Sequence, residues 1–125
     1  MSQTTEPEPL PIGAMAAAGS MGRFLARNPE FDRDDTLLWS PRASGDVRLD
    51  IKRCASGGPH RAVAIIEALG LPLRVYTYYS QALAADLVAL RADGPYDGAQ
   101  WSVQTAVPPE AWAAFLAEHP LAVAA

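Results

Sequence analysis

The sequence predicts an α+β domain with a single antiparallel sheet of about five strands and helices packed on one face. Two patterns support this class: apolar residues alternate with polar ones over 47–52, and they recur at helical spacing over 59–69. The expected order is helix, two strands, helix, three strands, helix. Neighbouring strands punctuated by helices are typical of an α+β layer.

The chain of 125 residues has the length of one domain, which we place at 12–120. Residues 1–11 hold three prolines and two glutamates and no apolar periodicity, so they predict a disordered leader. Residues 121–125 follow the last helix-ending proline and predict a flexible tail.

The first half of the domain begins with an alanine-rich helix over 13–27, which ends at Asn28 because a residue before proline avoids the helical region. A short strand is expected over 36–40 and a turn over 41–45. Val47, Leu49 and Ile51 alternate with charged residues, which predicts a half-buried strand over 47–52. These two strands are expected to form a hairpin.

The second half begins with a helix over 59–69, because Pro59 suits the first helical position and Gly70 suits the residue after the last. Valine, threonine and tyrosines predict a strand over 73–79. The alternation over 100–107 predicts another strand. A final helix is expected to begin at Pro108-Pro109-Glu110 and to end before Pro120.

Residues 81–93 allow two interpretations. Leucines at helical spacing favour a helix. The segment 93–98, however, is dense in turn residues and leads into the strand over 100–107, which needs an antiparallel partner just upstream. We therefore predict a strand over 86–93.

Charge and cysteine usage limit the function classes. The net charge of −4 excludes a basic nucleic-acid footprint over the whole chain, although residues 36–80 carry +3 between acidic flanks. Cys54 is the single cysteine, so no internal disulfide can form. No segment is long and apolar enough to cross a bilayer, and we expect a cytoplasmic protein without membrane contact.

Two short motifs carry a resemblance to known proteins. The first is Phe24-Leu25-Ala26-Arg27-Asn28-Pro29 with the acidic turn and Trp39, and the second is the Gly-x-aromatic-x-Gly turn at Gly94, Tyr96 and Gly98 within 86–107. Over about 20–107 the chain resembles small uncharacterised actinobacterial and actinophage proteins. The resemblance implies an α+β fold in an actinobacterium or its mobile elements. It carries no activity, and no functional residue is transferred.

The helix entry before Arg61 is a candidate anion-binding site, because free backbone N–H groups and the helix dipole favour anions there. Its candidate residues are Lys52, Arg53, Gly57, Gly58, His60 and Arg61. The segment is neither a Walker A loop nor a GxGxxG fingerprint. The alternative is a strand-to-helix turn that uses its glycines only for tight geometry.

A second candidate is a basic and aromatic sheet face. Arg48 and Lys52 share one face of their strand, and Arg74, Tyr76 and Tyr78 share one face of another. Charge beside stacking surfaces is typical of proteins that bind single-stranded nucleic acid. The alternatives are an ordinary solvent face and a contact between subunits.

Catalytic and metal chemistry find little support in the sequence. Cys54 and His60 could form a nucleophile–base pair, but such pairs arise easily by chance. One cysteine and two histidines far apart in sequence give no metal-ligand spacing, so we expect no metal and no cofactor. Trp39, Trp101 and Trp112 are expected in the core.

The sequence therefore favours a non-enzymatic interaction module that binds a protein partner or a second copy of itself. The alternative is a binder of an anionic ligand or nucleic acid that uses the basic centre, residues 48–74.

Overall fold

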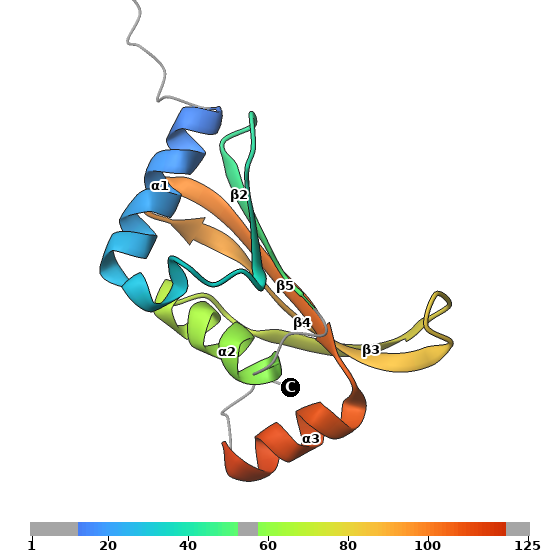
Figure 1. Cartoon of the computed structure of the whole chain (residues 1–125). Helices are drawn as coiled ribbons and strands as arrows, with labels where there is room; N and C mark the ends of the chain where they lie inside the picture. Colours follow the sequence, from blue (N-terminus) through green and yellow to red (C-terminus); the bar gives the residue numbers. More distant parts are fainter. Residues whose placement is uncertain (1–12, 53–57, 120–125) are drawn as a thin grey trace, which may run out of the picture.

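The computed structural model describes residues 13–52 and 58–119, which form three α-helices, one short 3-10 helix and one five-stranded sheet (Figure 1). The elements are α1 (Ala14–Arg27), η1 (Pro29–Phe31), β1 (Leu37–Pro41), β2 (Asp46–Ile51), α2 (Gly58–Leu69), β3 (Arg74–Ser80), β4 (Ala85–Tyr96), β5 (Ala99–Val107) and α3 (Pro109–Glu118). The predicted α+β class and element order are confirmed. The predicted leader and tail lie outside the described residues.

The strands follow the order β1-β2-β5-β4-β3. The predicted hairpin of β1 and β2 is present, and β3, β4 and β5 form an antiparallel meander. β5 runs parallel to β2, however, so the sheet is mixed rather than wholly antiparallel. The meander starts with β3, at the sheet edge opposite β1, and continues through β4 toward β2. Its last strand, β5, therefore lies beside β2 and runs in the same direction.

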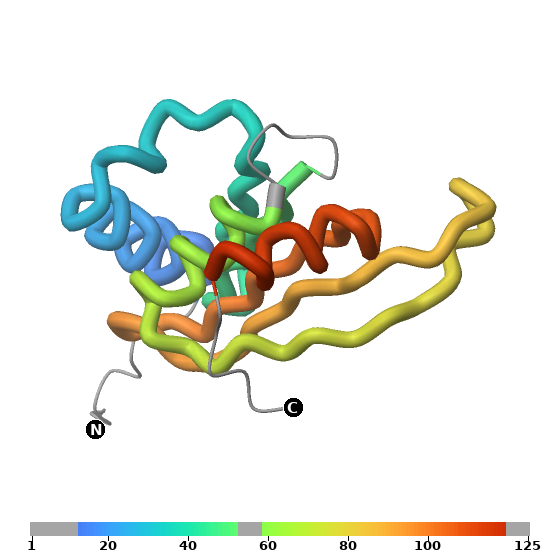
Figure 2. The backbone as a smooth tube through the Cα atoms, turned by 90° about the horizontal axis from the view of Figure 1, so that it is seen from below, coloured from blue at the N-terminus to red at the C-terminus, as the bar shows by residue number. Residues whose placement is uncertain are grey.

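The helices cover one face of the sheet, as Figure 2 shows, and the other face carries no helix among the described residues. α1 lies over β1, β2 and β5, whereas α2 lies over β5 and β4, and α3 lies over β4. The strands bury alternate residues against this helical layer. The side chains that are fully buried there include Val47, Leu49, Leu90, Trp101 and Val103. Burial of this apolar surface is the main favourable contribution to folding.

α1 is held by an aromatic cluster rather than by strong helix propensity, since it contains Gly19 and Gly22. Phe24 is fully buried, and its ring centroid lies 5.3 Å from that of Trp101 and 6.2 Å from that of Trp39. The indole N–H of Trp101 donates to Ser20 Oγ at 3.0 Å. The expected core positions of Trp101 and Trp112 are confirmed, and half-buried Trp39 packs against the core.

The ambiguous segment 81–93 contains a strand, as predicted, and β4 extends beyond both predicted ends. Gly94, expected in a turn, pairs with Trp101 inside the strand ladder. The turn itself is reduced to Asp97 and Gly98, whose φ angles are +47° and +83°. An Asp-Gly pair with positive φ at both positions is the favoured connection of a tight hairpin.

Candidate interaction surface on the open sheet face

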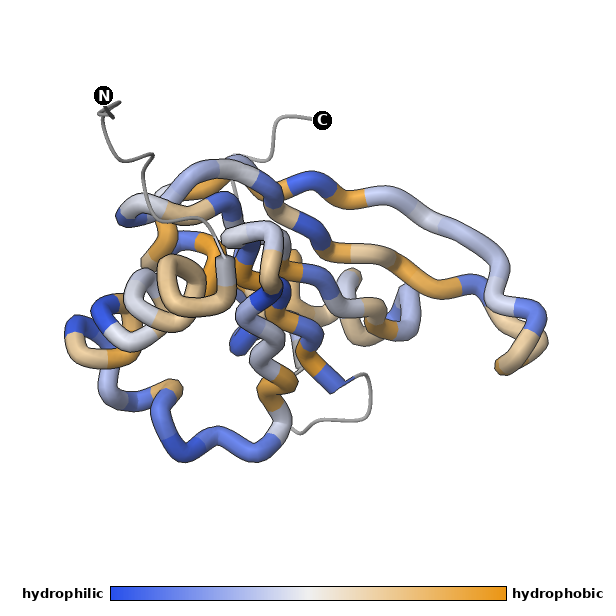
Figure 3. Tube along the Cα trace, turned by 90° about the horizontal axis from the view of Figure 1, so that it is seen from above, coloured by the Kyte–Doolittle hydropathy of each residue, from blue (hydrophilic) through white to orange (hydrophobic). Residues whose placement is uncertain are grey.

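The face of the sheet turned away from the helices is the open face. Hydrophilic and hydrophobic residues alternate along much of its strands (Figure 3). Because successive side chains of a strand point to opposite faces, the charged and amide residues of β2, β4 and β5 that alternate with the buried core residues share the open face. Arg48 on β2 and Arg74, Tyr76 and Tyr78 on β3 all lie on the open face, because they alternate with the core-facing residues. The structure therefore brings the four sheet-face candidates onto one surface.

A row of charged and amide side chains, the polar ladder, crosses this face from β2 to β3. Its members are Arg48, Asp50, Gln104, Arg91, Asp93 and Arg74.

The β3 end of the ladder is centred on Asp93. Arg91 Nε donates to Asp93 Oδ2 at 2.9 Å, and Arg74 Nη2 donates to the same oxygen at 2.8 Å. The hydrogen bond from Arg91 holds the pKa of Asp93 below its ordinary value, against the opposing effect of partial burial. Asp93 therefore stays ionised and neutralises much of the positive charge beside it.

The β2 end of the ladder is centred on Asp50. Gln104 Nε2 donates to Asp50 Oδ1 at 2.7 Å, and Arg48 Nε donates to Asp50 Oδ2 at 3.1 Å. Arg91 Nη1 reaches Gln104 Oε1 at 3.4 Å and joins the two ends. Charges thus alternate in sign along the ladder, whereas a track for a nucleic-acid backbone needs unneutralised positive charge.

A shallow depression of about 600 Å³ lies beside the ladder. Tyr76 and Tyr78 form one wall, with ring centroids 6.3 Å apart, and the small residues Ala89 and Ala106 belong to its lining. The side chain of Tyr76 is 49% exposed, which is unusual for a large aromatic residue in a sheet. The depression combines aromatic surface with polar groups, as binding surfaces commonly do.

The exposed aromatic surface continues along the hairpin formed by β3 and β4. Pairing of β4 with β5 begins only at Val88, so residues 85–87 pair with β3 alone. This hairpin projects beyond α3 (Figures 1 and 2). Tyr79 and Leu83 are 59% and 50% exposed on it. Four of the exposed large hydrophobic residues, Tyr76, Tyr78, Tyr79 and Leu83, therefore lie on one hairpin.

The two edges of the sheet differ. β1 has five residues and ends in Pro41, which cannot donate a backbone hydrogen bond. β3 has seven residues, Arg-Val-Tyr-Thr-Tyr-Tyr-Ser, with no proline and no glycine, and within the described chain no strand pairs with its outer side. A long edge strand rich in tyrosine is a ready template for pairing with another strand.

The candidate anion site is not assembled among the residues that the structure describes. Arg61 Nε pairs with Asp34 Oδ2 at 2.7 Å, so its side chain is directed at the acidic loop before β1. His60 contacts Phe115 and His119 on α3 instead. Lys52 is exposed just after β2, and Gly58 begins α2. Arg53, Gly57 and Cys54 lie outside the described residues.

Sequence reasoning missed Arg91, Asp93 and Gln104. Arg91 and Asp93 flank buried Ala92, and this alternation is the signal that could have found them once β4 is taken as a strand. Cross-strand pairing then places Arg91 opposite Gln104 and Arg74.

Comparison of the chain with protein-family models, with curated proteins and with solved structures finds no match. The resemblance drawn from the two short motifs therefore stays a prediction. In the described ranges, no helix has the length and apolarity needed to cross a membrane.

Proposed function

We propose that this protein is a non-catalytic interaction module whose partner is a second copy of the chain, joined through the outer side of β3. The observation that carries this proposal is the β3 edge, whose outer side pairs with no strand of the described ranges and which holds three of the exposed large hydrophobic side chains. Antiparallel pairing of two β3 strands would extend the sheet from one copy into the next and satisfy backbone groups on both.

The sequence of β3 suits pairing about a two-fold axis. With Thr77 on the axis, Tyr76 of each copy lies opposite Tyr78 of the other, and Val75 lies opposite Tyr79. In a closed dimer each contact occurs twice, so this register gives two aromatic pairs on the open face and two aromatic–aliphatic pairs on the other face. Such cross-strand pairs each contribute about 0.2–1 kcal/mol.

The charges near β3 also favour a second copy over a nucleic acid. Arg74 is the single charged residue of β3, and it is paired with Asp93 in its own chain. Two β3 strands can therefore approach without like charges meeting. The remaining arginines of the polar ladder, Arg48 and Arg91, are likewise paired with aspartates.

Replacing Thr77 with aspartate is expected to shift the dimer to monomer. The substitution places two carboxylates directly opposite each other on the axis, and like charges in that position destabilise a strand pair. We expect the dissociation constant of the dimer to rise roughly tenfold or more, because a loss of about 1.4 kcal/mol is tenfold. Analytical ultracentrifugation over a range of protein concentrations measures it.

The matched control is Ala113→Asp, which adds the same charge at an exposed position of α3 and should leave the dimer intact. A parent protein that stays monomeric at the highest soluble concentration would overturn the proposal. Salt-dependent retention of single-stranded DNA that is lost in Arg48→Ala and Arg74→Ala variants would instead support the nucleic-acid alternative.

A cross-linking experiment tests the register itself. In a Cys54→Ser background, Thr77→Cys places two thiols opposite each other on the axis, and directly opposed strand residues have Cα separations of about 4.5–5.5 Å, within reach of a disulfide. We expect rapid disulfide-linked dimer on mild oxidation. Gln100→Cys in the same background is the control, and equal rates for the two variants would contradict the register.

A further inference from the structure

We propose that His60, Glu118 and His119 form a zinc-binding site that links the first turn of α2 to the end of α3. The chain contains two histidines, and the fold brings both to one place although they lie far apart in the sequence. Each of the three residues offers a nitrogen or oxygen ligand atom, and these atoms all lie within 4.8 Å of one another. These three residues are called the histidine cluster below.

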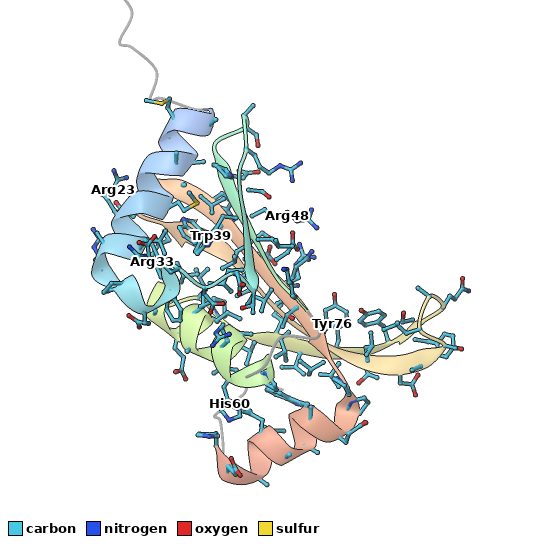
Figure 4. The ribbon with its side chains drawn as sticks, viewed as in Figure 1. Arg23, Arg33, Trp39, Arg48, His60 and Tyr76 are labelled. Carbon is cyan, nitrogen blue, oxygen red and sulfur yellow. The ribbon has the colours of Figure 1, made fainter. Side chains whose placement is uncertain are left out.

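Phe115 positions the two imidazoles. The ring of His119 stacks on Phe115 with a centroid distance of 4.8 Å, and the ring of His60 meets Phe115 edge-on at 4.7 Å. The two imidazoles lie 5.1 Å apart at an interplanar angle of 89°. Figure 4 shows His60 at the end of α2 that faces α3. A buried aromatic ring therefore holds both histidines beside each other before any ion arrives.

The polar atoms of the cluster are available to a ligand. Within the described residues no hydrogen bond engages either imidazole, and His119 Nε2 lies 4.0 Å from Glu118 Oε1. All three side chains are exposed, so an ion can reach them from solvent. The remaining coordination position of a tetrahedral ion would be taken by water.

The ligand set favours zinc. Two imidazole nitrogens and one carboxylate oxygen match the ligands of Zn²⁺, whereas Mg²⁺ and Ca²⁺ prefer oxygen alone. Bond lengths of about 2.0–2.2 Å place neighbouring ligands on a tetrahedral zinc roughly 3.4 Å apart. The cluster must therefore contract by only about 1–1.5 Å, which rotation of exposed side chains supplies.

Zinc bound there would clamp α3 onto α2. α3 follows β5 directly and attaches to the rest of the domain through Trp112 and Phe115, which are its two buried residues. An ion that binds the folded chain and not the unfolded one raises stability by mass action. Zinc binding should therefore be measurable in two ways: as a heat of binding with a stoichiometry of one zinc per chain, and as a rise in the Tm of thermal unfolding.

The test uses the untagged full chain, titrated with zinc chloride by calorimetry and unfolded with and without zinc. We expect one zinc per chain and a rise in Tm of roughly 5 °C at saturating zinc. Both His60→Ala and His119→Ala should weaken binding at least tenfold, and Glu118→Gln should weaken it less. Glu110→Gln, an exposed carboxylate of the same helix, is the control and should bind like the parent.

Three results would overturn the site. The first is a parent that takes up no zinc in the titration. The second is zinc binding that survives in the His60→Ala/His119→Ala double variant, and the third is zinc binding that is lost in a Cys54→Ser variant. Absorption of the Co²⁺-substituted protein gives a second readout, since a thiolate ligand adds an intense charge-transfer band that nitrogen and oxygen ligands do not.

Discussion

Replacing Trp101 with alanine is expected to lower the free energy of unfolding by about 3–5 kcal/mol. The side chain is fully buried, and its ring centroid lies within 6.0 Å of the ring centroids of Phe24, Trp39 and Tyr96. The substitution opens a cavity between α1 and the sheet and removes the indole N–H that bonds to Ser20. Domains of this size have a free energy of unfolding of only about 5–15 kcal/mol, so this substitution removes a large part of the total stability.

Urea denaturation followed by far-UV circular dichroism measures this loss, at a fixed protein concentration because dimerisation would add to stability. Leu38→Ala is the control, since Leu38 is 49% exposed on the open face and should cost less than about 1 kcal/mol. Ser20→Ala should fall between the two, at about 1–3 kcal/mol, because it leaves the buried indole N–H without its acceptor. A Trp101→Ala protein no less stable than Leu38→Ala would contradict the role of the aromatic cluster in holding α1.

The elements themselves follow from local patterns. The alternation over 47–52 and 100–107 and the Pro59 and Gly70 signals are properties of a few neighbouring residues, and the structure has β2, β5 and α2 at those places. Residues 93–98 mark where this reasoning is weakest. Gly94 and Pro95 favour a turn locally, but pairing with Trp101 and Gln100 keeps them in the strand. Tertiary pairing overrides local propensity there.

Local sequence patterns do not show which strands are neighbours in the sheet. Alternation shows that β2 and β5 each bury one face, but it says nothing of their direction relative to each other, so the parallel pair was not predicted. The polar ladder depends on the same information. Asp50, Gln104 and Arg91 meet only because β2, β5 and β4 are adjacent.

The histidine cluster shows this limit most clearly. His60 lies in the first turn of α2 and His119 follows the last residue of α3, and nothing in their spacing suggests contact. Packing of α2 against α3 brings them together. Metal sites built from ligands close in sequence are readable from spacing, whereas a site assembled by helix packing is not.

Asp34 ties the hydrophilic loop before β1 (Figure 3) to α2, beside the anchor that buried Phe31 provides in η1. Asp34 Oδ1 accepts hydrogen bonds from the backbone N–H and the hydroxyl of Thr36, and Asp34 Oδ2 pairs with Arg61 on α2 at 2.7 Å. The carboxylate is only 11% exposed. Burial by itself disfavours its ionised form, but the Thr36 hydrogen bonds and the charge of Arg61 outweigh burial and lower the pKa of Asp34.

Asp34→Ala is therefore expected to cost about 2 kcal/mol at pH 7, because a half-buried charged pair and two hydrogen bonds lose their acceptor. A carboxyl group with a lowered pKa in the folded state stabilises the fold above its unfolded pKa, near the ordinary value of 3.8, and loses that contribution as pH falls through the folded pKa. The difference in the free energy of unfolding between the parent and Asp34→Ala should then have its full size at neutral pH and become smaller below about pH 5. Urea unfolding at several pH values measures it, with exposed Asp32→Ala in the same loop as the control. A difference that stays constant into acid would show that Asp34 acts through packing and not through its charge.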